Sequence, residues 1–490
     1  MASNTERILL ADYPKLPLED SRVAEMVADA HDYAHAHGLV MRTSEQKDRS
    51  DVCQSAPFAL LPSPFPKSIF EKAVNVQNLI AGLYHDIAYD YEFLRKIHEN
   101  VVKTDEFTRN MLDVYTKVQE QGLAQPVTLA IQRSDYMCHK DPFSSEYCLK
   151  QIEVNNIASS MGAHAERLTN MHRRTMLNLG YDKEFLARCL PENKPIALIA
   201  EAIFKAWDYF NDPNAIVLVV IENVNQNQID QRHVEYELEK LGIPSDQIVR
   251  KNLTECHEKC TLAENKDLHY LGSRVAVVYF RAGYSPDHYP TRREWDARTI
   301  IELSTAIKSP WIGLQLVNTK KTQQVLADDG VVERFVGAPR DANAIRSTFA
   351  GLWPIDRDDA LTQKIVSGAI AHPDNFVLKP QLEGGAGNFY ARTMVEMLKT
   401  LKGDERGAFI LMEKLKPIVV ENYLIRANQP YALSKAVSEL GVYGYAFGRR
   451  DECVTKTGGH LLRTKGETVD EGGVAVGHAV IDTPFLYEFI

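Results

Sequence analysis

The fold of this chain is decided by the stretch FVLKPQLEGGAGNFY, which runs from Phe376 to Tyr390. It opens as a short apolar strand ending at Lys379, and the next residue, Pro380, has no N–H with which to continue a hydrogen-bond ladder. Three glycines and an alanine then fill positions 384–387. Such a backbone bends sharply, and its successive N–H groups can form a concavity that binds anions. The stretch predicts a phosphate-binding loop, although a solvent-exposed turn explains the glycines alone equally well.

The charges around this loop suit the same ligand. Lys379 at its base supplies a positive charge for phosphates, and Glu383 supplies a carboxylate oxygen for a hard cation such as Mg2+. The residue order is not GxxxxGK[ST], so this is not a Walker loop. We therefore expect a glycine-rich lid over residues 379–390.

Length and composition describe a large globular chain. Its 490 residues are enough for about three domains' worth of core. The hydrophobic fraction of 44% and the charged fraction of 25% are typical of soluble proteins. The net charge of −10 argues against nonspecific nucleic-acid binding, and no apolar run approaches the ~20 residues that span a bilayer.

The cysteines indicate a reducing compartment. They are odd in number and scattered, at positions 53, 138, 148, 189, 256, 260 and 453. The first residues include Glu6 and Asp12 and no apolar core of a signal peptide, so we expect a cytoplasmic protein. Cys256, His257 and Cys260 raise the alternative of a zinc site. No second pair follows at metal-ligand spacing, so two free thiols are the better interpretation.

Residues 1–125 are expected to form a mainly helical scaffold, and residues 126–212 the first part of a catalytic core. Apolar spacing predicts helices over 20–38, within 69–102, over 107–119, over 164–179 and over 196–207. Strands are predicted over 127–131 and 149–156. In the second strand Glu153 and Asn155 share one face, and their oxygens suit Mg2+. An edge strand with a polar face is an equally common alternative.

A small α/β domain is predicted over residues 213–319. The apolar runs 215–222 and 275–280 are typical of strands buried in a parallel sheet, with a helix over 230–241 between them. A helix over 295–308 follows. Ligands bind beyond the carboxyl ends of strands in such sheets. The polar residues that follow these two strands are Asn225, Asn227, Gln231, Arg281 and Tyr284.

The remaining residues, 320–490, are expected to bind a nucleotide. Lys320 and Lys321 begin a predicted helix over 319–327, where a solvated pair is the commoner case. A strand over 408–415 offers backbone groups and an adaptable methionine to an adenine edge. Strands over 433–447 contain Glu439, whereas Arg463 and Lys465 share one face of a later strand. Residues 466–477 form a second glycine-rich loop.

Together these residues suit a reaction in which a phosphoryl group is transferred to a carboxylate and an amine then attacks the product. The cationic side chains suit phosphates, and arginine forks suit an acidic substrate. Two glycine-rich loops can close and exclude water from a reactive intermediate. We place no Ser/His/Asp or Cys/His pattern, and none is needed. The substrates are the nucleophiles, which the protein positions and neutralises.

Ten motifs carry a family resemblance. In chain order they are RSDYM at 133–137, QIEVNN at 151–156, FRAGY at 280–284, WDAR at 295–298, TKKTQQ at 319–324, VLKPQLEGGAGN at 377–388, LMEKL at 411–415, SELGVYG at 438–444, HLLRTK at 460–465 and EGGVAVG at 471–477. With them the chain resembles the eukaryotic-type glutathione synthetases over nearly its whole length. The resemblance implies an α/β ATP-grasp fold with a glycine-rich lid and an inserted small α/β substrate-binding domain.

The resemblance also implies a reaction. ATP would drive ligation of γ-L-glutamyl-L-cysteine to glycine, giving glutathione, ADP and phosphate through an acyl phosphate. The family is a cytosolic homodimer that uses Mg2+. No nucleic acid and no membrane is expected as a partner.

Residue roles follow from the same resemblance, position by position. The implied catalytic residues are Arg463, Lys320 and Lys379, and the implied metal ligands are Glu153, Asn155 and Glu383. The implied ATP contacts are Glu153, Lys320, Lys379, Glu383, Gly384, Gly385, Ala386, Gly387, Asn388, Tyr390, Met412, Glu413, Lys414, Leu415, Glu439, Lys465 and Glu471. The implied substrate contacts are Arg133, Ile157, Ala158, Ser159, Ser160, Asn225, Gln226, Asn227, Gln231, Arg281, Ala282, Gly283, Tyr284, Arg463, Val474 and Ala475.

Five positions depart from the family pattern. Asn225 stands where Glu is usual, Leu382 where Arg is usual, and Ala386 where the loop has glycine. Asn156 and Ala158 replace Thr and Ser. Loss of the carboxylate at position 225 is expected to weaken capture of the dipeptide's amino group. Ala386 is expected to stiffen the lid if that position needs a positive φ.

These departures leave two alternatives open. One is a ligase of the same fold with another amine or dipeptide, and the other is a non-catalytic effector that kept the fold. The pair Val474–Ala475 matches members that use glycine, whereas plant relatives that use β-alanine differ there. None of the implied metal ligands or lysines is missing, so we predict an active enzyme that uses glycine.

Overall fold

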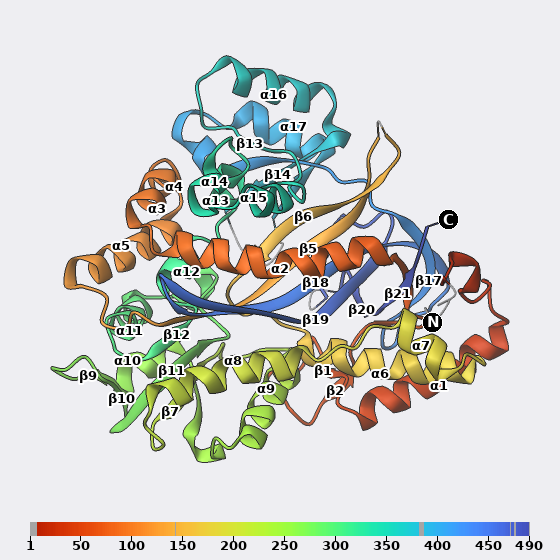
Figure 1. The fold of residues 1–490 in the computed structure, drawn as a ribbon, viewed down its shortest axis with the longest axis horizontal. Helices are drawn as coiled ribbons and strands as arrows, with labels where there is room; N and C mark the ends of the chain where they lie inside the picture. Colours follow the sequence, from red (N-terminus) through yellow and green to blue (C-terminus); the bar gives the residue numbers. More distant parts are fainter. Residues whose placement is uncertain (1–6, 143, 382–386, 471, 475–476, 490) are drawn as a thin grey trace.

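The fold is built around a seven-stranded, mostly antiparallel sheet (Figure 1). The computed structural model describes residues 7–142, 144–381, 387–470, 472–474 and 477–489. The strand order is β17-β3-β20-β19-β18-β5-β6, and β17 also pairs with β18. The strands are β17 (Val419–Ile425), β3 (Phe58–Ala59), β20 (Val480–Asp482), β19 (Glu452–Gly466), β18 (Leu433–Arg449), β5 (Thr128–Lys140) and β6 (Tyr147–Asn155).

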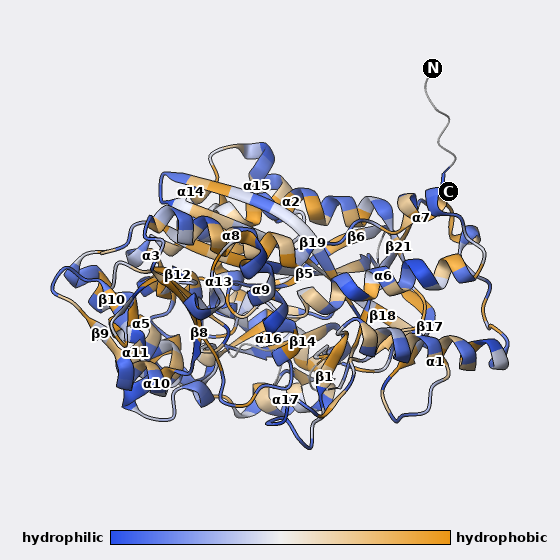
Figure 2. Ribbon diagram, turned by 90° about the horizontal axis from the view of Figure 1, so that it is seen from below, coloured by the Kyte–Doolittle hydropathy of each residue, from blue (hydrophilic) through white to orange (hydrophobic). Residues whose placement is uncertain are grey.

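Both faces of this sheet are apolar, because successive residues of each central strand enter different cores. Leu440 and Val442 pack with helix α2 (Lys67–Ala88), whereas Tyr443 and Tyr445 pack with α6 (Gly162–Asn178) and α8 (Pro195–Phe210). Figure 2 shows apolar residues gathered where helices meet the sheets. The sheet is therefore enclosed between helices.

The strand over 127–131 was predicted too short. β5 continues to Lys140, so Arg133 and Asp135 lie within a central strand rather than after it. Arg133 and Asp135 are buried and neutralise each other, a pattern that hydrophobic periodicity does not reveal. β6 agrees with the prediction and carries Glu153 and Asn155.

The small parallel unit agrees with its predicted strand–helix–strand order. Its strands are β7 (Ile216–Val220), β8 (Ile248–Lys251), β11 (Ser273–Phe280) and β12 (Ile307–Ser309), extended by antiparallel β9 (Cys260–Leu262) and β10 (Leu268–Tyr270). Helix α9 (Gln228–Leu241) ends where Gly242 adopts a φ of 108°, which favours glycine. The other helices are α10 (Leu253–Lys259) and α11 (Arg292–Glu302).

The single helix predicted over 295–308 was wrong. α11 ends at Glu302, and β12 begins at Ile307, because Ile307 to Ser309 pair in parallel with β11. This pairing joins residues that are distant in sequence. The spacing of apolar residues along the chain therefore does not reveal it.

A second, four-stranded sheet carries the stretch from Phe376 to Tyr390. Its order is β13 (Leu352–Pro354), β16 (Phe409–Glu413), β14 (Phe376–Pro380) and β15 (Phe389–Tyr390). Helices α16 (Ala360–Ala371) and α17 (Ala391–Thr400) pack against it through one apolar cluster. In Figure 1 this unit lies at the top of the view, above α2 and the strands β5 and β6.

Helix α13 (Lys320–Leu326) corrects the expectation of a solvated lysine pair. Lys320 and Lys321 are both buried, and their ammonium groups pair with Glu153 and Asp356. Thr319 caps this helix by accepting a hydrogen bond from the Thr322 backbone N–H at 3.3 Å.

The remaining elements complete the scaffold. The predicted helices over 20–38 and 107–119 appear as α1 (Asp20–Ala36) and α5 (Glu106–Gln121). The region 1–125 is less purely helical than expected, because it also contributes strands to three sheets. The other helices are α3 (Tyr91–Ile97), α4 (Val101–Thr104), α7 (Lys183–Cys189), α12 (Ile312–Leu316), α14 (Val331–Phe335) and α15 (Pro339–Arg346), and the other strands are β1 (Val40–Arg42), β2 (Cys53–Ser55), β4 (Ser63–Pro66) and β21 (Pro484–Tyr487).

Among the described residues, no helix combines the length and the apolar character that a bilayer crossing requires. The domain boundaries at 125, 212 and 319 stay predictions.

Candidate active site

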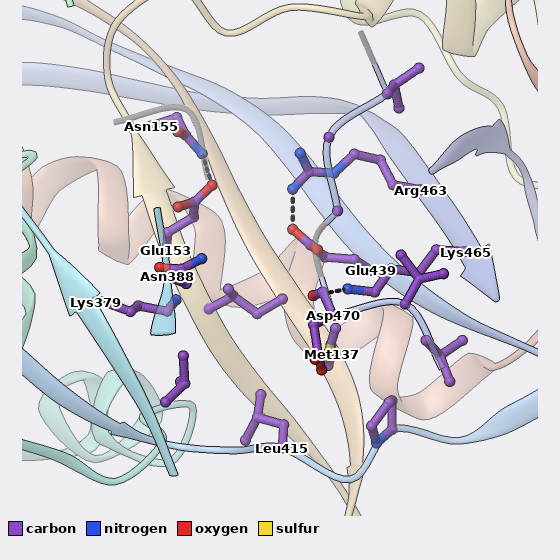
Figure 3. A pocket seen from close by; sticks show the side chains of 18 of the residues that line it. Met137, Glu153, Asn155, Lys379, Asn388, Leu415, Glu439, Arg463, Lys465 and Asp470 are labelled. Carbon is purple, nitrogen blue, oxygen red and sulfur yellow. Dashed lines mark hydrogen bonds and ion pairs between the residues drawn. The ribbon is translucent and has the colours of Figure 1, made fainter. Parts of the chain in front are cut away.

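One cavity of about 580 Å³ is lined by residues of both sheets, and most of the predicted site residues meet there. Figure 3 shows Glu153 and Lys379 on one side and Glu439, Arg463 and Lys465 on the other. The predicted residues that line the cavity are Arg133, Glu153, Asn155, Ile157, Ala158, Ser159, Ser160, Tyr284, Lys379, Asn388, Tyr390, Met412, Glu413, Lys414, Leu415, Glu439, Arg463, Lys465 and Val474.

Glu153 is a buried carboxylate in the wall of this cavity. Lys320 donates from Nζ to its Oε2 at 2.7 Å. Burial raises the pKa of Glu153, but the charges of Lys320, Lys379 and Arg463 outweigh burial and lower that pKa well below its ordinary value. The carboxylate is therefore ionised at neutral pH, and lysines from two distant segments surround it.

Asp135 is the buried centre of the site. Its two oxygens accept from Arg133 Nε at 2.7 Å and Arg133 Nη2 at 2.8 Å. Its Oδ2 also accepts from Arg463 Nη2 at 3.0 Å and from Asn155 Nδ2 at 2.9 Å. This carboxylate therefore fixes two predicted substrate residues and one predicted metal ligand. No role was predicted for Asp135, although it stands inside RSDYM.

Cross-strand pairing explains why these groups converge. Asp135 lies opposite Glu153 in the β5–β6 pair, and Glu439 lies opposite Arg463 in the β18–β19 pair. Arg463 donates to the Glu439 carboxylate. The opposite charges of Glu439 and Arg463 on facing strand positions stabilise their pairing. Asp135 and Glu153 are like charges, which their ion pairs with Arg133, Arg463 and Lys320 neutralise.

Gly441 makes room for this network. A Cβ at that position would lie 2.7 Å from Arg133 Cδ and 2.7 Å from Asp135 Oδ1. No real Cβ is found so close to another heavy atom, so the Arg133–Asp135 pair requires glycine on the neighbouring strand.

The loop 157–161 joins the cavity to the small α/β unit. Ala158 and Met161 both have positive φ, at 52° and 71°, which is uncommon for residues with a side chain. The Ser160 carbonyl accepts from Arg133 Nη1 at 3.1 Å, and the Ser159 carbonyl accepts from Arg281 Nη1 at 3.0 Å. Hydrogen bonds thus hold this loop in a strained shape, which is frequent at ligand sites.

The far wall of the cavity comes from β16 and from the segment after β19. Lys414 pairs with Asp470 at 2.9 Å, and its Nζ lies 5.2 Å from the centre of the Tyr390 ring. Lys465 donates to the Asp470 carbonyl at 2.5 Å. Asp470 was missed by the sequence reasoning, since nothing in its local pattern singles it out.

Other predicted residues lie off the cavity wall or outside the described part. Lys320 is buried behind Glu153. The other described residues that do not line the cavity are Asn225, Gln226, Asn227, Gln231, Arg281, Ala282, Gly283 and Gly387. The residues outside the described part are Leu382, Glu383, Gly384, Gly385, Ala386, Glu471 and Ala475.

Residues 20–486 of the chain match the family model "Eukaryotic glutathione synthase, ATP binding domain". The chain is 39% identical over 470 residues to the glutathione synthetase of Bos taurus, covering 95% of this chain and 98% of that protein.

The chain belongs to the eukaryotic glutathione synthase family.

Other members of this family extend the likeness. The chloroplastic glutathione synthetase of Arabidopsis thaliana is 36% identical over 478 residues, covering 96% of this chain and 86% of that protein. Among solved structures, a glutathione synthetase like-effector from Globodera pallida, in apo form, superposes with a TM-score of 0.77. That effector is 27% identical and covers 96% of this chain and 98% of its own. The glutathione synthase family therefore accounts for the α/β fold from end to end.

The alternative of a zinc site at Cys256, His257 and Cys260 finds no support. Within the described ranges, the group that could hold a metal ion is Asp135, Glu153 and Glu439. Cys256 and Cys260 are free, buried thiols on α10 and β9.

Proposed function

We propose that this protein is an ATP-dependent glutathione synthase, which joins γ-L-glutamyl-L-cysteine to glycine and releases ADP and phosphate. Family membership over residues 20–486 supports the reaction. The observation that supports it in the structure is the convergence of Lys320, Lys379 and Arg463, from distant parts of the chain, on Glu153, which lines the cavity.

The reaction consists of two steps, a phosphoryl transfer and an acyl transfer. A carboxylate oxygen of the cysteine end attacks the γ-phosphorus of ATP, and ADP leaves. The glycine amine then attacks the acyl carbon, loses a proton and displaces phosphate, which keeps that carboxylate oxygen. Arg463, with its raised pKa, remains charged and is suited to the negative charge that develops at the acyl oxygen.

Lys320 and Lys379 are proposed to hold the transferred phosphates. Lys320 is pre-oriented by Glu153, and Lys379 lies at the end of β14, where Pro380 stops the strand. Positive charge that is fixed before the substrate binds costs no reorganisation during the reaction.

The residues also fit Mg2+. Glu153 is ionised, and Asn155 donates through Nδ2 to Asp135, which leaves its Oδ1 as a cation ligand. Glu383, the third proposed ligand, lies outside the described residues. When bound, Mg2+ neutralises the phosphates of ATP and draws electrons from the transferred group.

Glycine is the proposed amine, and Val474, which lines the cavity, supports that assignment. A homodimer in the cytoplasm completes the proposal, by likeness to the family. Light scattering on the purified protein tests the dimer: a mass near 110 kDa, about twice the 55.3 kDa of one chain, is expected.

The likeness to a glutathione synthetase like-effector motivates a second candidate, a non-catalytic effector that kept the fold. Release of phosphate from Mg-ATP decides between them. The ligase requires phosphate to depend on both γ-glutamylcysteine and glycine, whereas background release with both present rejects it. Exchanging glycine for β-alanine or serine tests the third candidate, a ligase for another amine.

A further inference from the structure

The segment that joins β16 to β17 runs from the four-stranded sheet to the seven-stranded sheet, and part of it lines the cavity. Lys414 and Leu415 are the cavity residues that follow β16 directly. The Lys414 N–H donates to the Asn375 carbonyl at 2.8 Å. Among the described residues, the Lys414 carbonyl and the Leu415 N–H have no hydrogen-bond partner. One backbone acceptor and one backbone donor in succession are therefore left for a ligand.

His139, near the end of β5, holds this segment against the central sheet. The Lys416 N–H donates to His139 Nδ1 at 2.9 Å. The backbone pairs on either side of it, with Lys140 N–H donating to the Lys416 carbonyl at 2.8 Å and Ile418 N–H to the Cys138 carbonyl at 3.0 Å. His139 is 2% exposed and does not line the cavity. It therefore acts on the cavity only through the backbone that it holds.

The imidazole of His139 must be neutral to make this contact. Because Nδ1 accepts a hydrogen bond, the ring proton sits on Nε2, which lies 3.8 Å from Glu413 Oε1. The other charged groups that face the ring are Lys150, Asp141 and Lys416. Burial lowers the pKa of His139 below its ordinary 6.5, although Glu413 acts to raise it. The ring therefore accepts at neutral pH and loses this ability in acid.

We propose that His139 is a positioning residue for nucleotide recognition, which holds the Lys414 carbonyl and the Leu415 N–H in place to bind the base of ATP. The edge of adenine carries an amino donor beside a ring-nitrogen acceptor, which matches a carbonyl followed by an N–H. The inference rests on the proposed function, in which ATP is a substrate. It adds a residue outside the cavity, for which no role was predicted, to those that determine the choice of base.

The test compares ATP with purine riboside triphosphate, which has the same phosphates and lacks the 6-amino group. Wild-type kcat/KM should favour ATP about 3- to 10-fold, the range expected for one neutral hydrogen bond. His139→Leu leaves the Lys416 N–H without its acceptor. This variant should lose most of the preference and raise the KM for ATP by a similar factor, while kcat at saturating ATP and the KM for glycine stay within about twofold.

His139→Gln is the conservative variant, because its side-chain oxygen can accept from the Lys416 N–H at any pH. It should keep the wild-type preference at neutral pH. Between about pH 7.5 and pH 5 the preference of the wild type should fall as Nδ1 gains a proton, whereas that of His139→Gln should stay constant. Titration of the triphosphate affects both nucleotides alike, so the ratio of their kcat/KM values reports on the base.

His257→Leu is the control, because His257 is an exposed histidine on α10. It should keep the wild-type preference and its pH response. An unchanged preference in folded His139→Leu overturns the assignment of His139. If that variant does not fold, equal pH responses of the wild type and His139→Gln overturn the assignment instead. Absence of turnover in the wild type overturns the proposed function, so the two failures are distinguishable.

Discussion

Lys320 and Glu153 are joined by a 2.7 Å hydrogen bond that spans 167 residues of sequence. Lys320 begins α13, whereas Glu153 lies on β6 of the central sheet. Because the pair is buried, each charge depends on the other, and a change in one disturbs the electrostatics of the whole cavity.

Removing the charge of Glu153 should abolish most turnover. Glu153→Gln keeps the shape but leaves Lys320, Lys379 and Arg463 without their shared counter-charge. We expect kcat to fall at least ~100-fold, as for other groups that stabilise transition-state charge. Steady-state release of phosphate measures this fall in kcat, with Glu237→Gln, whose side chain pairs with Lys240 on α9, as the control. A variant that retains more than a tenth of wild-type turnover contradicts the role.

The same substitution should change how stability depends on pH. The pKa of Glu153 is lower in the folded protein than its ordinary 4.5, so its stabilising contribution is present above about pH 4.5 and is lost as pH falls further. Glu153→Gln should therefore cost about 3 kcal/mol of unfolding free energy at neutral pH. The wild-type advantage should shrink in acid. Urea unfolding at several pH values measures this difference, and a constant difference refutes it.

Gly441→Ala tests the close packing around Arg133 and Asp135. The added Cβ would lie 2.7 Å from atoms of both side chains, so we expect a loss of about 1–3 kcal/mol and a higher KM for the dipeptide. Gly368→Ala is the control, since nothing lies within 4 Å of that Cβ and the residue is inside α16. The control should be neutral or slightly stabilising, because alanine favours helix. Equal behaviour of the two variants refutes the packing claim.

Asp135→Asn should weaken both the activation by Mg2+ and the binding of the dipeptide. Asn155 would lose its charged acceptor, Arg133 would lose its counter-charge, and Arg463 would keep only Glu439. We expect the Mg2+ concentration for half-maximal activity to rise about tenfold, comparable with loss of other residues that orient metal ligands. Asp296→Asn, on the surface of α11, is the control. An unchanged Mg2+ response in a folded variant contradicts the positioning role.

The sequence predicted the regular elements well where periodicity is strong. The helix ending before Gly242 and the buried strand β7 were found within a few residues of their predicted bounds. β5 was predicted too short, because its continuation through Arg133 and Asp135 is polar. The burial of these two residues is offset by their own ion pair and by the pair of Asp135 with the distant Arg463.

Most residues of the candidate site could be predicted from the sequence, but the contacts between them could not. Lys320, Lys379 and Glu153 could be named from the family resemblance, yet burial of the Lys320–Lys321 pair depends on partners far away in sequence. The role of Asp135 as the common acceptor depends on strand register, which one sequence does not specify.

Transfer of an oxygen atom from substrate to phosphate tests the account most directly. γ-Glutamylcysteine labelled with oxygen-18 in the cysteine carboxylate is incubated with the protein, Mg-ATP and glycine, and the phosphate released is examined by mass spectrometry. We expect one labelled oxygen in each phosphate, because a carboxylate oxygen attacks phosphorus and leaves as part of the phosphate. Unlabelled phosphate, released at the rate of glutathione formation, would contradict an acyl phosphate formed in this cavity.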